Sequence, residues 1–395
     1  LIACNQKQHN MDKGSYGYDV NFLEKHKVGF IELKAPDSLS RSIVVPNWQG
    51  RIMTSTAGGS KGKSYGWINY DFIQKGEKSN QFNVYGGEER FWIGPEGGKY
   101  SIYFDKGAEQ VFENWRVPSF IDTEAYKVTG KTDESVTMEQ SAMITNAYGT
   151  IFNLSVNRKV SMLSREEIEK DLGISDGTGL KMVAYRSDNL MTNTGQEAWA
   201  KEDGLLSIWM LCMFTPSPTV TVFVPYNSDT SLNKIPVVND EYFGKVPANR
   251  LIHDDDMIYF KIDGKLRSKI GIPQGRARNI CGSYDADNKL LTILWFNLPD
   301  TDAPYVNRNW GAQDDPYNGD VVNSYNDGPL EDGSIMGPFY EIETSSPGAM
   351  LAGGENILHT QKVYHLEGEE YMLDRITQTL FGLSLKDVKF KFKNN

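Results

Sequence analysis

Two carboxylates spaced two residues apart are the part of this sequence best suited to chemistry. Between residues 337 and 366, Glu341 and Glu343 alternate with apolar and hydroxyl-bearing side chains. This alternation is typical of a β-strand, and it places both carboxylates on the same face. Burying a carboxylate is costly unless it is paired or neutralised, so a strand glutamate beside a polar loop predicts a site. The alternative is a half-buried strand whose two carboxylates lie at a solvated edge.

The residues after these glutamates predict a strand, a loop and a second strand. The run SSPG at residues 345–348 ends the first strand, since Pro and Gly interrupt regular structure. Gly353 and Gly354 indicate a tight turn, and residues 357–364 return to an extended pattern.

A second stretch, RFWIGPE, combines a cation, an aromatic ring and a carboxylate between pairs of glycines. Its Arg90, Trp92 and Glu96 predict a polar pocket with an aromatic wall. The alternative is a hairpin in which the glycines serve the turns and Arg90 pairs with Glu88 or Glu89.

The order of motifs around Glu343 resembles the galactose mutarotase (aldose 1-epimerase) superfamily. Glu343-Thr344 is followed by a nearby Pro, then by Gly354-Glu355, and then by His359 and Thr360. In that family a strand E-T-Q is followed by P-D, and a later G-E precedes H-T. The sequence departs from this pattern at two positions, where Ser345 replaces the Gln and Gly348 replaces the Asp.

The resemblance covers roughly residues 30–366 and implies a fold, a ligand class and roles for residues. The fold would be all-β, a large antiparallel β-supersandwich of the galactose mutarotase type with a few short helices. The ligand would be a carbohydrate, and no cofactor or metal is implied. The implied roles are Glu343 as catalytic base, Glu96, at the position of a family His, as the second catalytic residue, and Arg90 and His359 as substrate-binding residues. The residues themselves add Trp92, Glu341 and Trp310 of the long polar loop to the substrate-binding set.

Two classes of function follow from these residues. The family places a His before an aromatic residue on one strand and another in a His-Gly-Gly turn, but no His of this chain occupies either position and Glu96 replaces the second. General acid chemistry near neutral pH usually uses His. The sequence therefore favours a carbohydrate-recognising lipoprotein that uses a mutarotase-like cleft without established catalysis. The alternative is an aldose 1-epimerase or related sugar-active enzyme with Glu343 as base.

Composition limits the partners of the chain. The 395 residues are 39% hydrophobic, 12% aromatic and 24% charged, with a net charge of −11. This acidic balance argues against a nucleic-acid partner, which requires a basic face. The sequence has no run of about 18 apolar residues, so no membrane-spanning helix is predicted.

The first residues predict a lipid anchor as the only link to a membrane. Leu1-Ile2-Ala3-Cys4 resembles a bacterial lipobox, in which the Cys becomes the lipidated N-terminus. The polar residues 5–18 suggest a flexible tether. We therefore expect a lipobox remnant and tether over residues 1–27, a single β-supersandwich domain over residues 28–395, and a location in the bacterial cell envelope, facing the periplasm or the cell surface.

Further patterns predict the remaining elements. SREE at residues 164–167 is a capping box that begins a short helix ending at Gly173, and residues 369–381 predict another helix. Residues 182–191 and 205–214 are expected to pair as strands, residues 299–329 to form a long polar loop, and residues 388–392 to form an edge strand. Two apparent motifs, AGGSKGKS at residues 57–64 and GISDG at residues 173–177, lack the strand–loop–helix context of a phosphate loop or a nucleophile elbow. Cys212 and Cys281 lie in strand-like contexts as candidate buried thiols.

Overall fold

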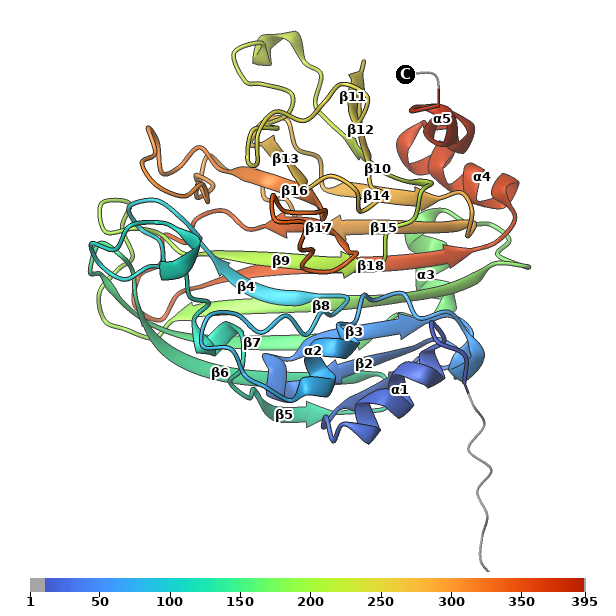
Figure 1. Ribbon diagram of the computed structural model, residues 1–395, viewed down its shortest axis with the longest axis horizontal. Helices are drawn as coiled ribbons and strands as arrows, with labels where there is room; N and C mark the ends of the chain where they lie inside the picture. Colours follow the sequence, from blue (N-terminus) through green and yellow to red (C-terminus); the bar gives the residue numbers. More distant parts are fainter. Residues whose placement is uncertain (1–10, 394–395) are drawn as a thin grey trace, which may run out of the picture.

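The largest element of the fold is a ten-stranded antiparallel sheet (Figure 1). The structure is a computed structural model, and it describes residues 11–393. Period-2 alternation is visible in the outer strands of the sheet, where one face is exposed and the other is buried. In spatial order the strands are β11 (Leu251–Asp254), β12 (Met257–Lys261), β10 (Val220–Pro225), β14 (Ile280–Asp285), β15 (Leu290–Phe296), β18 (Asn356–Glu367), β8 (Lys181–Asn193), β7 (Ile151–Met162), β6 (Ser135–Thr145) and β5 (Lys127–Lys131).

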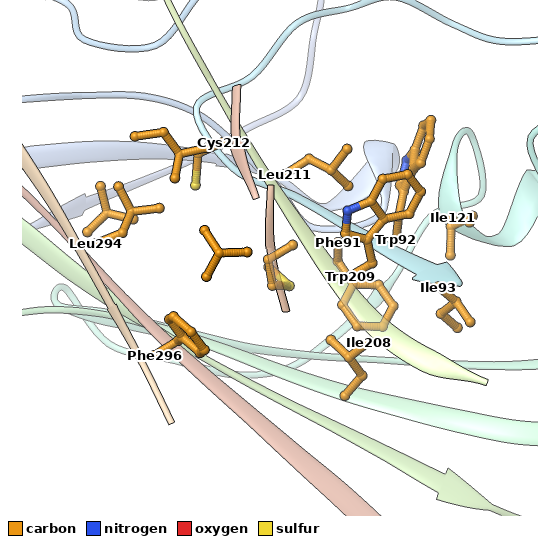
Figure 2. Packing of buried hydrophobic residues seen from close by; sticks show 14 of the residues in the cluster. Phe91, Trp92, Ile93, Ile121, Ile208, Trp209, Leu211, Cys212, Leu294 and Phe296 are labelled. Atoms are coloured by element: carbon orange, nitrogen blue, oxygen red, sulfur yellow. The ribbon is translucent and has the colours of Figure 1, made fainter. Parts of the chain in front are cut away.

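A five-stranded antiparallel sheet packs against this large sheet. Its order is β13 (Ser268–Pro273), β16 (Asp320–Asn326), β17 (Tyr340–Ser345), β9 (Ser207–Phe214) and β4 (Arg90–Gly94). Four of these strands, β4, β9, β16 and β17, are buried along their whole length. One face meets the large sheet, and long segments between strands cover the other. Figure 2 shows Cys212 of β9 with Leu294 and Phe296 of β15 in the layer between the two sheets.

A smaller unit at the N-terminal end completes the fold. It contains the three-stranded sheet β1 (Ile31–Lys34), β2 (Arg41–Val45) and β3 (Arg51–Thr56), together with the helices α1 (Tyr16–Lys25) and α2 (Tyr70–Lys75). Apolar side chains of both helices and of β2 and β3 share one core cluster. Single-turn 3₁₀ helices lie at Pro46–Trp48, Gly59–Lys61, Phe112–Asn114, Ser119–Ile121 and Thr230–Leu232.

The predicted fold class is confirmed: the protein is all-β, with large antiparallel sheets and few short helices. The capping box is also confirmed, because Ser164 and Glu167 cap helix α3 (Arg165–Leu172) reciprocally and Gly173 ends it in the left-handed conformation. The predicted helix near residues 369–381 is α4 (Glu370–Phe381). Within residues 11–393, no helix has the length and apolar character that crossing a membrane requires.

The predicted C-terminal edge strand is wrong. Residues Leu385–Phe390 form helix α5, which packs on the outer face of the large sheet beside α3 and α4. Ser384 caps this helix, and Leu385 and Val388 are buried three residues apart, which is a helical spacing. The alternation at positions 388, 390 and 392 therefore does not describe the buried face.

The predicted pairing of residues 182–191 with residues 205–214 is also wrong. Strand β8 pairs with β7 and β18 in the large sheet, whereas β9 pairs with β17 and β4 in the five-stranded sheet. The intervening segment therefore crosses from one layer to the other instead of closing a hairpin.

The predicted loop over residues 299–329 contains a strand. Strand β16 lies between β13 and β17 and is buried throughout. Its composition is polar, but its polar side chains have partners: Asn323 Nδ2 donates to the Ile270 carbonyl, and Ser324 Oγ donates to the Glu341 carbonyl. These hydrogen bonds offset the cost of burying polar side chains. A polar composition therefore did not distinguish this buried strand from a surface loop.

The predicted tether does not extend to residue 27. Helix α1 begins at Tyr16, and its Tyr16 and Leu23 are buried in the core of the N-terminal unit. Cys4 and the rest of the lipobox motif lie outside the described residues, so lipidation stays a prediction.

The docked helix α1 carries a buried carboxylate that makes stability depend on pH. Asp19 accepts hydrogen bonds from Ser64 Oγ and Tyr70 OH, and burial raises the pKa of Asp19 to about 6 from 3.8. Because the folded pKa lies above the unfolded one, the folded state favours the protonated form. Its contribution is present below pH 4 and is lost as the pH rises to about 6.

We therefore expect Asp19→Asn to gain stability relative to the wild type as the pH rises from 4 to 7. The shift of about 2 pKa units corresponds to a gain of about 3 kcal/mol in the free energy of unfolding. Urea unfolding at the two pH values measures it, with the exposed Asp133→Asn as control. A difference between Asp19→Asn and the wild type that does not change with pH would contradict this assignment.

Candidate functional site

Strand β17 presents its two glutamates on the face that points away from the large sheet. Tyr340 and Thr344 face the large sheet, where they hydrogen-bond Ser283 and His359. Since side chains alternate along a strand, Glu341 and Glu343 lie on the opposite face. Glu343 is fully buried and Glu341 nearly so, which rules out the alternative of a solvated strand edge.

Strand register brings the predicted arginine and tryptophan to the same face. Leu211 of β9 stands opposite both Arg90 of β4 and Glu343 of β17, so these residues form one row across the sheet. In the adjacent row Trp92 stands opposite Trp209, with ring centres 5.6 Å apart. Figure 2 shows Trp92 and Trp209 beside each other on these two strands.

Both glutamates are held by cations. The Arg90 guanidinium pairs with Glu341, and not with the Glu88 or Glu89 of its own segment. The Lys269 Nζ lies 2.9 Å from Oε1 of Glu343 and donates to its Oε2 at 3.0 Å. Burial raises the pKa of Glu341; the Arg90 charge opposes this rise and the nearby Glu343 charge adds to it.

Trp209 also holds the Glu343 carboxylate, through the same oxygen to which Lys269 donates. Its indole Nε1 donates to Oε2 of Glu343 at 2.9 Å. The Lys269 Nζ lies 5.2 Å from the centre of the Trp209 ring, and the Arg308 guanidinium lies 4.7 Å from it. Glu343 therefore lies in a charged cluster with an aromatic floor.

Glu96 is close enough to Glu343 for the two charges to affect each other. Burial raises the pKa of Glu96, and the Glu343 charge adds to this rise. The charges of Lys269 and Arg308 oppose it. Because its pKa is raised, Glu96 keeps its proton up to a higher pH than an exposed glutamate does. Its neighbour Glu343 accepts hydrogen bonds from Trp209 and Lys269.

A wall of indole rings lies beside the carboxylates. Trp115 lies between Trp92 and Trp310, with ring centres 6.4 and 6.1 Å from theirs. Within residues 11–393, the buried Nε1 atoms of Trp92 and Trp115 and the buried Nε of Arg90 have no hydrogen-bond partner. A buried donor without a partner is costly, so these three N–H groups are available to donate to a water molecule or to a ligand oxygen.

Most of the predicted site residues are thus brought together. Arg90, Trp92, Glu341 and Glu343 come from the five-stranded sheet, whereas Glu96 and Trp310 come from the segments that cover it. They form a buried cluster and not the open pocket that the sequence predicted, because ion pairs and covering segments fill the space over β17. Glu96 and Trp310 are only partly buried and form the edge nearest the surface.

His359 does not belong to this cluster. It lies on β18 of the large sheet, and its Nε2 is 2.8 Å from Thr344 Oγ1, on the opposite face of β17 from Glu343. Burial lowers the pKa of His359 to about 3, which keeps the ring neutral. The structure therefore contradicts its predicted place in the substrate-binding set.

The sequence-based prediction missed six residues of the cluster, which are Trp115, Trp209, Tyr242, Lys269, Arg308 and Asp320. Lys269 alternates with apolar residues in the run SKIGIP, a strand signal that could have identified it. Arg308, Asp320 and Tyr242 lie in polar segments without periodicity. In the structure Tyr242 donates to Asp320, while Arg308 donates to Ser345 Oγ at 2.6 Å and to Asn323. Burial raises the pKa of Asp320.

The predicted burial of the two thiols is confirmed, and the structure decides their pairing, which the sequence left open. Cys212 and Cys281 are free cysteines between the sheets, and burial raises the pKa of both. A thiol with a raised pKa is a poor nucleophile, so neither adds reactivity to the site. Among the described residues, no group of three or more His, Cys, Asp or Glu side chains is arranged to hold a metal ion.

Comparisons with known proteins give a family and a set of similar folds. The model of a family described as "Family of unknown function (DUF6786)" matches residues 14–392. No curated protein matches the sequence.

Three solved structures illustrate the similarity. A galactose mutarotase-like protein from Lactobacillus casei is 12% identical, with a TM-score of 0.48 over 85% of this chain and 100% of that chain. The Slr1438 protein from Synechocystis is 13% identical, with a TM-score of 0.49 over 86% and 96%. A galactose mutarotase related enzyme from Lactobacillus acidophilus is 9% identical, with a TM-score of 0.45 over 86% and 97%.

Proposed function

The chain belongs to the DUF6786 family, a family of unknown function, and we propose that it recognises a carbohydrate at the cluster around Glu343. The observation that carries this proposal is the set of unpartnered N–H groups of Arg90, Trp92 and Trp115, buried beside two carboxylates. A sugar offers hydroxyl groups that accept from N–H groups and donate to carboxylates, and C–H faces that pack on indole rings.

Access to the site depends on the covering segments. Glu343 has no exposed surface, so a sugar can reach it only when a covering segment moves. The segment with Trp310 is the best candidate, because Trp310 is partly exposed and lies at the edge of the cluster. Binding energy would then stabilise the opened arrangement at the expense of the closed one.

Sugar binding that depends on Glu343 is the direct test. We expect a panel of mono- and oligosaccharides to contain a ligand that raises the melting temperature. At 100 times its dissociation constant, this ligand should stabilise the folded protein by about 2.7 kcal/mol. Glu343→Gln should weaken that ligand roughly tenfold to a hundredfold, the value of a hydrogen bond to a charged group.

The control is Glu331→Gln, on an exposed segment, which should bind as the wild type does. Isothermal titration calorimetry measures all three proteins. If no sugar binds, or if Glu343→Gln binds with unchanged affinity, the proposal is wrong.

The alternative function is that of an aldose 1-epimerase. Glu96 favours it, because a carboxyl group with a raised pKa beside Glu343 offers an acid and a base. In this reaction Glu343 would take the proton from the anomeric hydroxyl while the acid protonates the ring oxygen, and the opened sugar would close on either face.

We expect no acceleration of mutarotation of α-glucose or α-galactose. No His occupies either position where the resembled family has one, and Lys269 and Trp209 already hold the Glu343 carboxylate in place. Polarimetry on the freshly dissolved α-anomers measures the rate. A rate well above the buffer background that Glu343→Gln lowers by about 10²–10⁴-fold would instead establish the epimerase.

For the location we propose the cell envelope, on the lipobox motif at Leu1–Cys4 alone. Incorporation of a labelled fatty acid during expression of the full gene, lost in Cys4→Ala, tests this. Equal labelling of the two proteins, or no labelling of the wild type, would contradict it.

A further inference from the structure

A polar groove lies beside the turn between β6 and β7, separate from the Glu343 cluster. It encloses about 540 Å³, and its lining includes Tyr148, Ile151, Asn153, Asn193, Gln196 and Trp199. We call it the Tyr148 groove. A volume of this order accommodates one or two sugar rings, well beyond what a few water molecules require.

The lining combines aromatic surface with amide groups. Tyr148 is 45% exposed and Ile151 is 57% exposed, so apolar surface faces solvent here. Asn193 forms a fixed part of the floor, because its Nδ2 donates to the carbonyls of Glu197 at 2.8 Å and Leu351 at 3.0 Å. Aromatic faces beside amides suit a ligand with both hydroxyl groups and C–H faces.

The charges at the groove favour a neutral ligand. Glu197 and Asp203 contribute carboxylates to the lining, and Lys99 Nζ lies 4.3 Å from the centre of the Tyr148 ring. The two signs are therefore mixed, and the whole chain carries a net charge of −11. A polyanionic ligand would be repelled by that overall charge.

Stacked tyrosines connect the groove with the segments that cover the Glu343 cluster. Tyr100 packs edge-on against Tyr148 at 5.6 Å and stacks on Tyr317 at 6.1 Å. Tyr100 follows Glu96 by four residues, and Tyr317 belongs to the same segment as Trp310. These packed rings link the rim of the groove to the two segments that carry Glu96 and Trp310, the partly buried residues of the cluster.

From these contacts we propose that the ligand is a neutral oligosaccharide, with one unit at the Glu343 cluster and further units in the Tyr148 groove. This inference rests on the proposed function and adds the substrate class: a glycan chain and not a free monosaccharide. The Tyr148 ring provides the stacking surface for a remote unit.

Calorimetry with sugars of matched chemistry tests it. The probes are cellohexaose, xylohexaose, maltohexaose and mannohexaose, each beside its own monosaccharide. We expect at least one hexasaccharide to bind the wild type tenfold or more tightly than its monosaccharide. Tyr148→Ala should weaken that hexasaccharide roughly tenfold, the upper value for one aromatic contact, and leave the monosaccharide unchanged.

Two further variants make the outcomes distinguishable. Tyr371→Ala removes a tyrosine that is exposed on α4, on the far side of the large sheet, and should bind every probe as the wild type does. Glu343→Gln should weaken the monosaccharide and the hexasaccharide alike. Melting temperatures within a few degrees of the wild type show that Tyr148→Ala and Tyr371→Ala remain folded.

Equal affinity for hexasaccharide and monosaccharide, with both affinities lowered by Glu343→Gln, would contradict sugar binding in the Tyr148 groove and leave the proposed function intact. A loss on Tyr148→Ala with no effect of Glu343→Gln would place binding in the groove alone and overturn both the extension and the proposed site. Absence of binding by every probe would overturn both.

Discussion

Replacing Arg158 by Met should lower the free energy of unfolding by about 3–5 kcal/mol. Arg158 of β7 and Glu89 are both fully buried between the sheets, with NH2 of Arg158 2.6 Å from Oε1 of Glu89. Removing the cation leaves a carboxylate whose remaining partners are Ser187 at 3.1 Å and Gln361 at 2.7 Å, both neutral.

The effect is large because the charge cannot return to water. Ionised groups in a low-dielectric interior lose their hydration, and only the partner compensates for that loss. A typical domain has about 5–15 kcal/mol of stability in total, so Arg158→Met should lose a large part of it. Chemical denaturation followed by fluorescence measures the difference.

Two controls separate this mechanism from general damage. Arg186→Met on the neighbouring strand β8 removes an exposed pair with Asp188 at 2.8 Å and should cost less than about 1 kcal/mol. Adding Glu89→Gln to Arg158→Met should recover part of the loss, since no unpaired charge then remains. A loss below about 1 kcal/mol for Arg158→Met alone would show that the interior is better hydrated than the structure indicates.

The second large effect concerns Lys269, the residue that links stability to the proposed function. Lys269→Met should also cost about 3–5 kcal/mol, because it leaves the fully buried Glu343 without its cation. It should abolish sugar binding as well, since Lys269 is one of the donors that fix the Glu343 carboxylate.

A double substitution distinguishes the two consequences. Lys269→Met with Glu343→Gln removes both charges, so we expect most of the stability to return while sugar binding stays absent. The matched control is Lys289→Met, which removes an exposed pair with Glu369 at 2.7 Å and should change neither property by a measurable amount. Recovery of binding in the double variant would show that Lys269 and Glu343 are structural and lie outside the binding site.

The sequence identified the residues at the centre of the candidate site, but not whether their side chains are exposed, paired or buried. Alternation around Glu343 predicted a strand glutamate on one face, and the run RFWIGPE predicted a nearby arginine, indole and carboxylate. The first prediction rests on the two-residue repeat of a strand, which neighbouring residues determine, and the second rests on the residue types that stand together in the run. Whether the carboxylate is exposed, paired or buried depends on what covers the strand, and the covering segments lie far away in the sequence.

The misplaced elements have the same origin. The alternation at positions 388–392 suggested a strand, but Ser384 as a cap and burial of Leu385 and Val388 against the large sheet select helix α5. The polar residues of β16 suggested a loop, but hydrogen bonds to β13 and β17 make their burial possible. In both segments tertiary packing overrides the local preference.

By itself the sequence determined the all-β class, the capped helix α3 and the strand positions of Glu341 and Glu343, because each depends on residues that are close together in the chain. Only the tertiary structure decided that β9 lies between β4 and β17, and that Lys269 reaches Glu343. It also placed His359 on the other face of β17. Strand order and ion-pair partners follow from which surfaces are buried against each other, and that is settled by contacts between residues that are distant in the chain.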